Sequence, residues 1–106
     1  MKVLGLEEVK EKLSRIEGWN LEEGTPPCIA REFQTKNWKT TLFVVNAIAS
    51  LAESQWHHPD LEVSFKKVKV KLTTHEAGGI TERDLRLAES LNELIPRVLD
   101  PTGALR

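Results

Sequence analysis

All three histidines of this 106-residue chain, His57, His58 and His75, fall within nineteen positions of one another. Imidazole has an ordinary pKa of about 6.5, so a histidine can donate or accept a proton near neutral pH. Glu53 lies four residues before His57. On a continuous helix both side chains would project from one face, where the carboxylate could orient the ring. Proton transfer is therefore one chemistry that these residues could perform.

A metal site is the alternative chemistry for the same residues. Glu53, His57 and His75 together form a His-His-Glu set of a kind that zinc accepts. The chain lacks the two-histidine helical spacing of the familiar zinc hydrolases. We therefore expect the histidines to work without a metal.

The elements that position these residues follow from the hydrophobic pattern. Apolar residues recur at helical spacing over about 6–17, 38–56 and 85–95. Alternating patterns predict four strands, near 19–21, 29–33, 61–65 and 68–73. Pro59 should stop the second helix nearby, and Pro96 should end or kink the third. The predicted order is helix, two strands, helix, two strands, helix.

This order predicts an α+β fold: a single two-layer domain over 1–106, with a four-stranded antiparallel sheet and three helices on one face. His57 and His58 would end the central helix. His75 would leave the sheet opposite the apolar residues of the last strand, or escape that parity if the strand has ended by Thr74. Thr81 and Asp84 resemble a capping box at the start of the last helix.

The central helix has a wider apolar arc than one small sheet would need. One stripe runs from Trp38 to Trp56, and Phe43, Val44 and Leu51 belong to a second stripe beside it. This excess suggests a helix shared with another subunit. Trp38 and Trp56 are therefore expected in the core or in a subunit interface.

Charge and composition exclude several classes of protein. Fifteen Lys and Arg against sixteen Asp and Glu give a net charge of -1, so the strong positive field of a nucleic-acid binder is missing. The lysines at 66, 67, 69 and 71 lack an aromatic stacking platform on their own face. A single cysteine, Cys28, and an N-terminus without a long apolar stretch favour a cytoplasmic protein with no membrane segment.

The histidine region resembles the signature of the pterin-4a-carbinolamine dehydratases. The resemblance rests on the run at 53–59, Glu-Ser-Gln-Trp-His-His-Pro, followed by Phe65, His75 and Asp84 at the family's spacing. Three further segments agree with it: Gly18-Trp19-Asn20, Thr74-His75-Glu76 and Thr81-Glu82-Arg83-Asp84. The similarity runs from about Gly18 to Leu94, which is most of the chain.

The resemblance implies a hydro-lyase that dehydrates 4a-hydroxytetrahydropterin, the product of aromatic amino acid hydroxylases, to quinonoid dihydropterin. Such an enzyme supports tetrahydrobiopterin recycling and needs no cofactor. The resemblance also implies a homodimer or homotetramer whose subunits join their sheets and assemble further through helices. The alternative on the same scaffold is a non-catalytic dimerisation or assembly partner, similar to a transcriptional coactivator.

The resemblance also implies roles for individual residues. His57 and His75 are the expected acid and base, in either order, while His58 contacts the substrate and Glu53 orients a histidine. Four more residues are expected to line the pterin pocket: Pro59, Thr74, Glu76 and Trp19. Arg83 and Asp84 are expected to anchor the helix start near the site rather than to catalyse.

Three positions depart from the family pattern. Thr35 stands where an aromatic residue is frequent, Trp56 where an acidic or other polar residue precedes the histidine pair, and Phe65 where tyrosine is common. None of them removes a proposed acid or base. Trp56 is expected to alter the rim of the pocket, and therefore substrate affinity more than chemistry.

Overall fold

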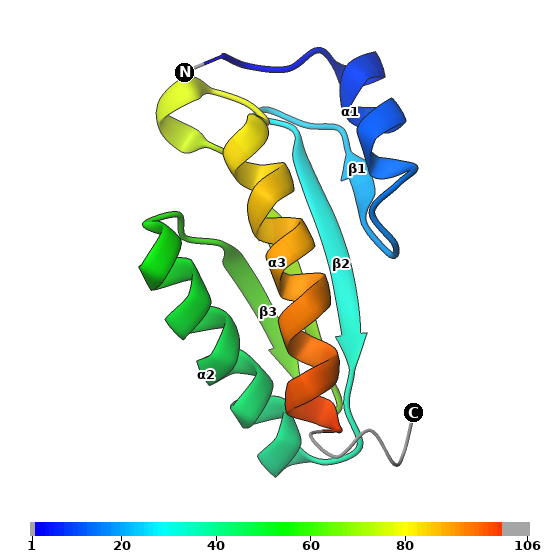
Figure 1. Cartoon of the computed structure of the whole chain (residues 1–106), viewed down its shortest axis with the longest axis vertical. Helices are drawn as coiled ribbons and strands as arrows, with labels where there is room; N and C mark the ends of the chain where they lie inside the picture. Colours follow the sequence, from blue (N-terminus) through cyan, green and yellow to red (C-terminus); the bar gives the residue numbers. More distant parts are fainter. Residues whose placement is uncertain (1, 101–106) are drawn as a thin grey trace.

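The computed structural model describes residues 2–100, which form one antiparallel sheet with two long helices lying across it (Figure 1). The elements are α1 (Leu6–Leu13), β1 (Asn20–Glu22), β2 (Cys28–Gln34), α2 (Trp38–Gln55), β3 (Asp60–Ser64), β4 (Lys67–Leu72), the short 3-10 helix η1 (His75–Ala77) and α3 (Glu82–Leu99). The predicted element order and the α+β two-layer class are confirmed.

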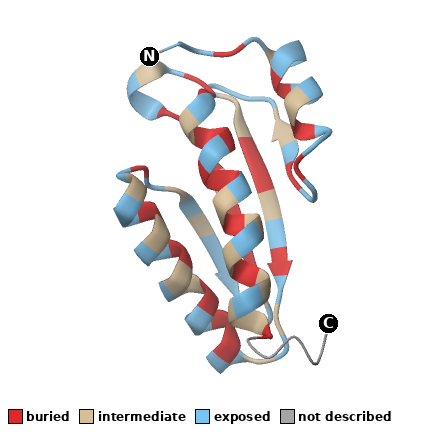
Figure 2. Cartoon of the chain, in the orientation of Figure 1, coloured by how far each residue is buried: buried red, intermediate tan, exposed pale blue. Residues whose placement is uncertain are grey.

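The strands follow the order β1-β2-β4-β3, and every neighbouring pair is antiparallel. The register places Ile29 opposite Leu72 and Phe33 opposite Val68, so these four side chains share the face that the helices cover. The buried sides of all three helices join this face in one apolar core. Figure 2 shows the buried residues as a stripe along each of the two long helices.

The buried side of α2 differs from the predicted stripe. Val44, Ile48 and Ala52 are buried against the sheet and α3, whereas Trp38 and Trp56 are exposed. Of the two expected places for these tryptophans, the core of the chain is therefore excluded, and a subunit interface stays a prediction. Both stripes have helical spacing, and spacing alone does not say which of two adjacent stripes faces the sheet.

Two helix ends also differ from the prediction. The first helix ends at Leu13 rather than near 17, because Arg15 and Ile16 form bonds three residues back instead of four. The last helix continues past Pro96 to Leu99. Proline removes only its own N–H donor, and Ile95 and Leu99 on either side pack against the core.

The face of the sheet that the helices leave open carries ion pairs between strands. Each lysine of β4 lies within 4 Å of a glutamate from another strand: Lys67 of Glu32, Lys69 of Glu22, and Lys71 of Glu62. Their carboxylates neutralise the lysine row that the sequence places on this strand.

No helix within residues 2–100 is both long enough and apolar enough to span a membrane.

Candidate active site

His57 is turned into the protein by the way α2 ends. Trp56 adopts a left-handed conformation (φ 51°) directly after the helix, and the N–H of His57 then donates to the carbonyl of Ala52, five residues back. This pattern is a Schellman motif, which reverses the chain direction at a helix end. His57 consequently points inward and is only 5% exposed, while His58 remains at the surface.

The partner of His57 is the carboxylate of Asp84, whose Oδ1 lies 2.5 Å from the histidine Nε2. Asp84 is fully buried, and its other oxygen, Oδ2, accepts from the Thr74 hydroxyl at 2.8 Å and from the Thr81 backbone N–H at 2.9 Å. With both oxygens held, the carboxylate has one fixed orientation. Asp84 is also the third residue of α3 and completes its capping box, so the helix start positions it.

This arrangement determines which nitrogen of His57 is available for chemistry. A carboxylate oxygen accepts hydrogen bonds, so in the neutral ring Nε2 is the donor to Asp84 and Nδ1 keeps its lone pair. Nδ1 makes no hydrogen bond within residues 2–100, and no buried side-chain nitrogen or oxygen of these residues lacks a partner. Nδ1 is therefore accessible to a small molecule in the adjoining cavity and can take up a proton there.

Glu53 serves the other histidine of the pair. Its Oε1 lies 2.9 Å from Nε2 of His58, and both side chains are exposed. The pairing expected between Glu53 and His57 is not formed, because α2 ends at Gln55 and the left-handed turn at Trp56 breaks the four-residue helical relationship. The Trp56 ring stacks edge-on to His58, with 5.0 Å between ring centroids.

His75 approaches the same region from the end of the sheet. Strand β4 ends at Leu72, and His75 opens η1, so its side chain has escaped the strand parity, as one of the two predicted alternatives required. Its Nε2 lies 3.7 Å from Oδ2 of Asp60, and both groups are largely exposed. The preceding residue, Thr74, is buried and pairs with Gly79 in an isolated bridge that closes the η1 loop.

A small cavity of about 210 Å³ brings the three histidines together. It is lined by Trp56, His57, His58, Thr73, His75, Glu76 and Arg83. Arg83 holds the wall in place by donating to Glu76 Oε2 at 3.2 Å and to the carbonyl of Trp56. A bond from its own backbone N–H, and then the nearby Arg83, keep the pKa of Glu76 below its ordinary value, so Glu76 is a carboxylate at neutral pH.

Other predicted site residues lie at different distances from this cavity. Thr74 sits behind it and bonds Asp84, and Pro59 follows the histidine pair at the start of β3. Trp19 is not at this site: its buried indole donates to Asn92 Oδ1 at 2.8 Å and meets Phe33 edge to face. The position of Trp19 before a strand suggested that it lies beside the pocket. Its large apolar ring is instead buried in the core, where it contacts α3 and β2.

Asp84 has a closer relation to the site than the sequence suggested. The capping pattern Thr81-x-x-Asp84 predicts a structural role for Asp84 at the start of α3 and gives no indication of its contact with His57. The spacing of His57 and Asp84, 27 residues apart, carries no local signal.

Within residues 2–100 there is no group of three or more His, Cys, Asp or Glu side chains placed to hold a metal ion.

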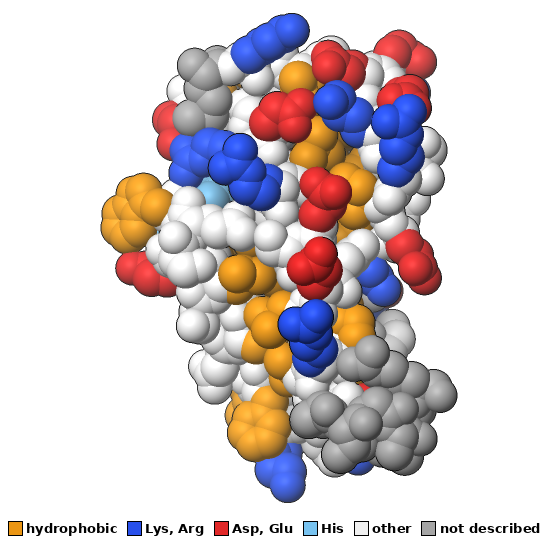
Figure 3. Space-filling view, in the orientation of Figure 1, with side chains coloured by type: hydrophobic (Ala, Val, Ile, Leu, Met, Phe, Trp, Pro, Cys, Tyr) orange, Lys and Arg blue, Asp and Glu red, His pale blue; other side chains and the backbone are white. Residues whose placement is uncertain are grey.

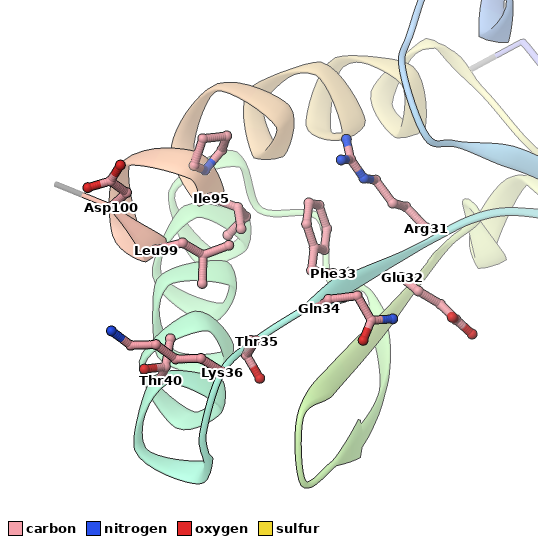
Figure 4. Close-up of a pocket in the computed structure, with 11 residues that line it drawn as sticks. Arg31, Glu32, Phe33, Gln34, Thr35, Lys36, Thr40, Ile95, Leu99 and Asp100 are labelled. Carbon is pink, nitrogen blue, oxygen red and sulfur yellow. The ribbon is translucent and has the colours of Figure 1, made fainter. Parts of the chain in front are cut away.

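A larger cavity, of about 670 Å³, lies elsewhere, between the second half of β2 and the end of α3 (Figure 4). Phe33, Ile95 and Leu99 form its apolar part, while Lys36 and Glu32 project at its edge. It contains no histidine in its lining. The larger volume of this cavity therefore does not make it the candidate active site.

Comparisons with known proteins identify the family of the chain. The family model for pterin 4 alpha carbinolamine dehydratase matches residues 2–94. A protein of Aquifex aeolicus (strain VF5), provisionally named a pterin-4-alpha-carbinolamine dehydratase, is 70% identical over 96 residues, or 91% of this chain and 94% of the relative. A protein of Thermomicrobium roseum with the same provisional name is 45% identical over 82 residues, or 77% of this chain and 85% of the relative.

Two solved structures share the fold. A transcriptional coactivator/pterin dehydratase from Brucella melitensis superposes with a TM-score of 0.79 and 32% identity, over 87% of this chain and 97% of that one. A pterin dehydratase-like protein described as a RuBisCO assembly factor in the alpha-carboxysome superposes with a TM-score of 0.63 and 21% identity, over 74% and 90%. From its family model and its relatives, the chain belongs to the pterin-4-alpha-carbinolamine dehydratase family.

Proposed function

We propose that this chain catalyses the loss of water from 4a-hydroxytetrahydropterin to give quinonoid dihydropterin. The observation that carries the proposal is the cavity in which His57, oriented by buried Asp84, faces His58 and His75. Membership in the dehydratase family supplies the substrate class. The cavity supplies groups that can move protons near neutral pH.

The reaction requires two coordinated proton movements. The C4a–O bond breaks and the hydroxyl leaves as water after receiving a proton, while N5 loses its proton and its electron pair forms the C4a=N5 double bond. No atom changes its oxidation state overall, so the reaction needs an acid and a base but no electron acceptor. Two histidines in one cavity provide both.

The surroundings of the histidines suit them to different roles. Nδ1 of His57 is an accessible acceptor, because Nε2 donates to Asp84; His57 is therefore the base that takes the N5 proton. His75 is largely exposed, so water can return a proton to it after each turnover; His75 is the acid for the departing hydroxyl. His58 and its partner Glu53, at the cavity edge, bind the hydroxyl or the ring.

The direct test follows the decay of freshly generated 4a-hydroxytetrahydropterin by absorbance, in the presence of a metal chelator. Wild-type protein should accelerate the decay, and His57→Ala and His75→Ala should each lose the acceleration. Lys10→Ala, at an exposed position of α1, is the matched control. No acceleration by folded wild-type protein would refute the proposed function.

The substrate also indicates a supplying reaction. A 4a-hydroxytetrahydropterin is left when an aromatic amino acid hydroxylase inserts one oxygen atom into its substrate, so we propose that this chain acts after such an enzyme and helps to regenerate tetrahydrobiopterin. Coupled assays should show a higher steady rate of the hydroxylase when this protein is added. An unchanged rate over a range of protein concentrations would separate the chain from that process.

We further propose that the chain works as a homodimer or homotetramer. The apolar side chains of Trp38, Leu42 and Phe43 are exposed on α2. Strand β1 pairs only with Cys28–Ala30 of β2, and within residues 2–100 no strand pairs with the same edge of β2 at 31–34. An unpaired strand edge and an exposed apolar helix are the two features by which subunits could join sheets and helices.

Light scattering on a sizing column tests this assembly. The wild-type mass should be two or four times the chain mass of 12.0 kDa. Phe43→Lys should lower it, because a charge would have to be buried in the helix interface. The exposed Lys10→Glu on α1 is the control, and a monomeric wild-type protein would contradict the proposal.

A second function on the same scaffold is a non-catalytic partner role, as a dimerisation or assembly factor. The observation in its favour is the exposed apolar surface of α2, and one similar structure bears the name of a transcriptional coactivator as well as a pterin dehydratase. The two functions separate in one experiment. His57→Ala should abolish dehydration and leave a partner role intact, whereas Phe43→Lys should abolish the partner role.

A further inference from the structure

Trp56 lines the histidine cavity but contributes nothing to the apolar core. Its side chain is 68% exposed, and it borders the cavity together with His57, His58 and His75. The indole belongs neither to the core of residues 2–100 nor to the partly buried residues packed against that core. Figure 3 shows a large hydrophobic group projecting from the surface close to a histidine and to basic side chains. Packing of the fold therefore does not account for a large apolar side chain at this position.

The backbone of Trp56 does not account for the side chain either. Its φ of 51° lies in the left-handed region, where glycine is the usual residue at a helix end because it has no Cβ. Most other side chains raise the energy of this conformation. Residues held in such conformations cluster at binding sites, and so do exposed apolar surfaces. Both features of Trp56 thus occur at the rim of a cavity.

Hydrogen bonds on both sides of Trp56 fix its backbone at this rim. The Trp56 N–H donates to the carbonyl of Glu53 at 3.1 Å, and the Trp56 carbonyl accepts from the Arg83 side chain. The indole lies edge-on to His58, with 5.0 Å between ring centroids, and His58 is in turn 2.9 Å from Glu53. The indole is therefore positioned before a ligand binds, which lowers the conformational entropy lost on binding.

The rest of the cavity lining shows what the indole adds. Among the described residues that line the cavity, Trp56 is the only hydrophobic one, and the other six carry polar or charged side chains. Small-molecule sites usually combine apolar and aromatic surface with a few polar groups that orient the ligand. A tetrahydropterin keeps a flat, conjugated pyrimidine half, with polar atoms along its edge and apolar faces. The polar residues can bind the edge, and Trp56 offers the large apolar surface that a face requires.

From these observations we infer that Trp56 is a substrate contact that determines specificity, with its indole packed against a face of the pterin ring. The inference rests on the proposed function for the substrate class. It deepens that function, because a contact with the ring does not depend on the group that C6 carries. The site then recognises a pterin by its ring and accepts different C6 side chains.

Calorimetric titration with two stable ligands tests the contact: 6-methyl-7,8-dihydropterin, and a 7,8-dihydropterin whose C6 carries a dihydroxypropyl group. Trp56→Ala should weaken the binding of both ligands by about tenfold, the size of one stacking contact between an aromatic side chain and a heteroaromatic base. The ratio of the two affinities should stay at its wild-type value. Trp56→Phe keeps a smaller aromatic face and should recover most of the lost affinity.

Phe65→Ala is the matched control for Trp56→Ala. Phe65 is 62% exposed, close to the value for Trp56, but it lies in the turn after β3 and does not line the cavity. Its removal should leave both affinities unchanged.

Kinetics give a second readout of the same contact. In Trp56→Ala the KM for the carbinolamine should rise by about tenfold while kcat stays nearly unchanged, because the indole contacts the ring equally in the ground state and in the transition state. Phe65→Ala should keep the wild-type KM.

Three results would overturn the inference. Unchanged affinities in folded Trp56→Ala would mean that the indole does not contact the ligand. Weaker binding of the dihydroxypropyl ligand alone would mean that the indole contacts the side chain rather than the ring. A lower mass of Trp56→Ala on the sizing column would place the indole in a subunit interface instead.

The outcome is separable from that of the proposed function. If wild-type protein dehydrates the carbinolamine and Trp56→Ala does so with the same KM, only the contact is refuted. If neither protein dehydrates it but pterin binding depends on Trp56, the enzyme is refuted and the contact stands.

Discussion

Nε2 of His57 lies 2.5 Å from Oδ1 of Asp84, and both side chains are almost completely buried. The same carboxylate closes the capping box of α3 through its other oxygen. The start of one helix therefore orients the histidine that follows the end of another. Capping of α3 and placement of the proposed base therefore both involve a single side chain.

Replacing Asp84 should impair activity and stability together. In Asp84→Asn the His57 tautomer is no longer set by a carboxylate, so we expect a rate loss of about 10² to 10⁴-fold, similar to loss of the base itself. The double variant with His57→Ala should be no slower than the single ones, because the two groups act as one unit. Dehydration kinetics on the three variants test this.

Thr81→Ala is the matched control for the helix cap. It removes the hydroxyl that accepts from the Arg83 N–H and bonds the Thr74 hydroxyl, but it keeps the direct hydrogen bonds of Asp84 to His57, Thr74 and the Thr81 N–H. We expect a loss of about 1 kcal/mol in the free energy of unfolding and a rate within tenfold of the wild type. If Asp84→Asn lost stability but kept its rate, Asp84 would be a capping residue only.

The two adjacent histidines should respond differently to truncation. His57→Ala and His75→Ala should each lower kcat by about 10² to 10⁴-fold, the usual range for a lost general acid or base. His58→Ala should mainly raise KM, because His58 lies at the exposed edge of the cavity with Glu53. Equal and negligible losses in all three variants would remove the histidines from the mechanism.

Glu53→Gln refines the same assignment. It keeps the size of the side chain but removes the charge that faces His58, so its effect should resemble a mild form of His58→Ala, with a higher KM and a nearly unchanged kcat. A large drop in kcat would mean that Glu53 acts on His57 instead.

Trp56 holds a backbone conformation that disfavours its side chain. Its φ of 51° is the only positive φ of a non-glycine residue within residues 2–100. Glycine adopts this conformation without a Cβ penalty, so Trp56→Gly should raise the free energy of unfolding by about 1 kcal/mol. Chemical denaturation would measure the change.

Phe65→Gly offers the control for Trp56→Gly, since Phe65 is also an exposed aromatic residue but has no positive φ. That substitution should leave the free energy of unfolding unchanged or lower it. If Trp56→Gly were instead less stable than wild type, the contacts of the indole, such as that with the His58 ring, would stabilise the protein by more than the left-handed backbone of Trp56 destabilises it.

The ion pairs on the open sheet face predict a pH dependence. The pKa of Glu62 is lowered, first by its hydrogen bond from Lys71 and then by the charge of that lysine. A lowered pKa means that the contribution to stability is present above the ordinary value of 4.5 and is lost as pH falls through the folded value. The free energy of unfolding should therefore fall as the pH drops below 4.5. The fall should be less steep in Glu62→Gln than in wild type.

Salt provides the control for this prediction. Because Glu62 is exposed and Lys71 is only partly buried, 1 M salt, with a screening length of about 3 Å, should reduce the difference between the two proteins. On the alkaline side, the pKa of Lys71 is raised by Glu62, so the same pair weakens only above the ordinary lysine value of 10.5. Identical acid slopes in wild type and Glu62→Gln would contradict the assignment.

The sequence by itself determined the elements and their class. Helical and alternating spacings are local, and they placed four strands and three helices close to their observed ranges, including the capping box at Thr81 and Asp84. The family signature at 53–59, His75 and Asp84 also lies in the sequence alone. Its match to the family model over residues 2–94 confirms that resemblance.

Only the tertiary structure decided which partners meet. The left-handed conformation of Trp56 turns His57 inward, so Glu53 pairs with His58 instead. Helical spacing could not predict this pairing, because such spacing holds only while the helix continues. The pairing of His57 with Asp84 joins residues 27 positions apart. Such contacts depend on how α2 and α3 pack on the sheet, and that packing is a property of the whole core rather than of any local pattern.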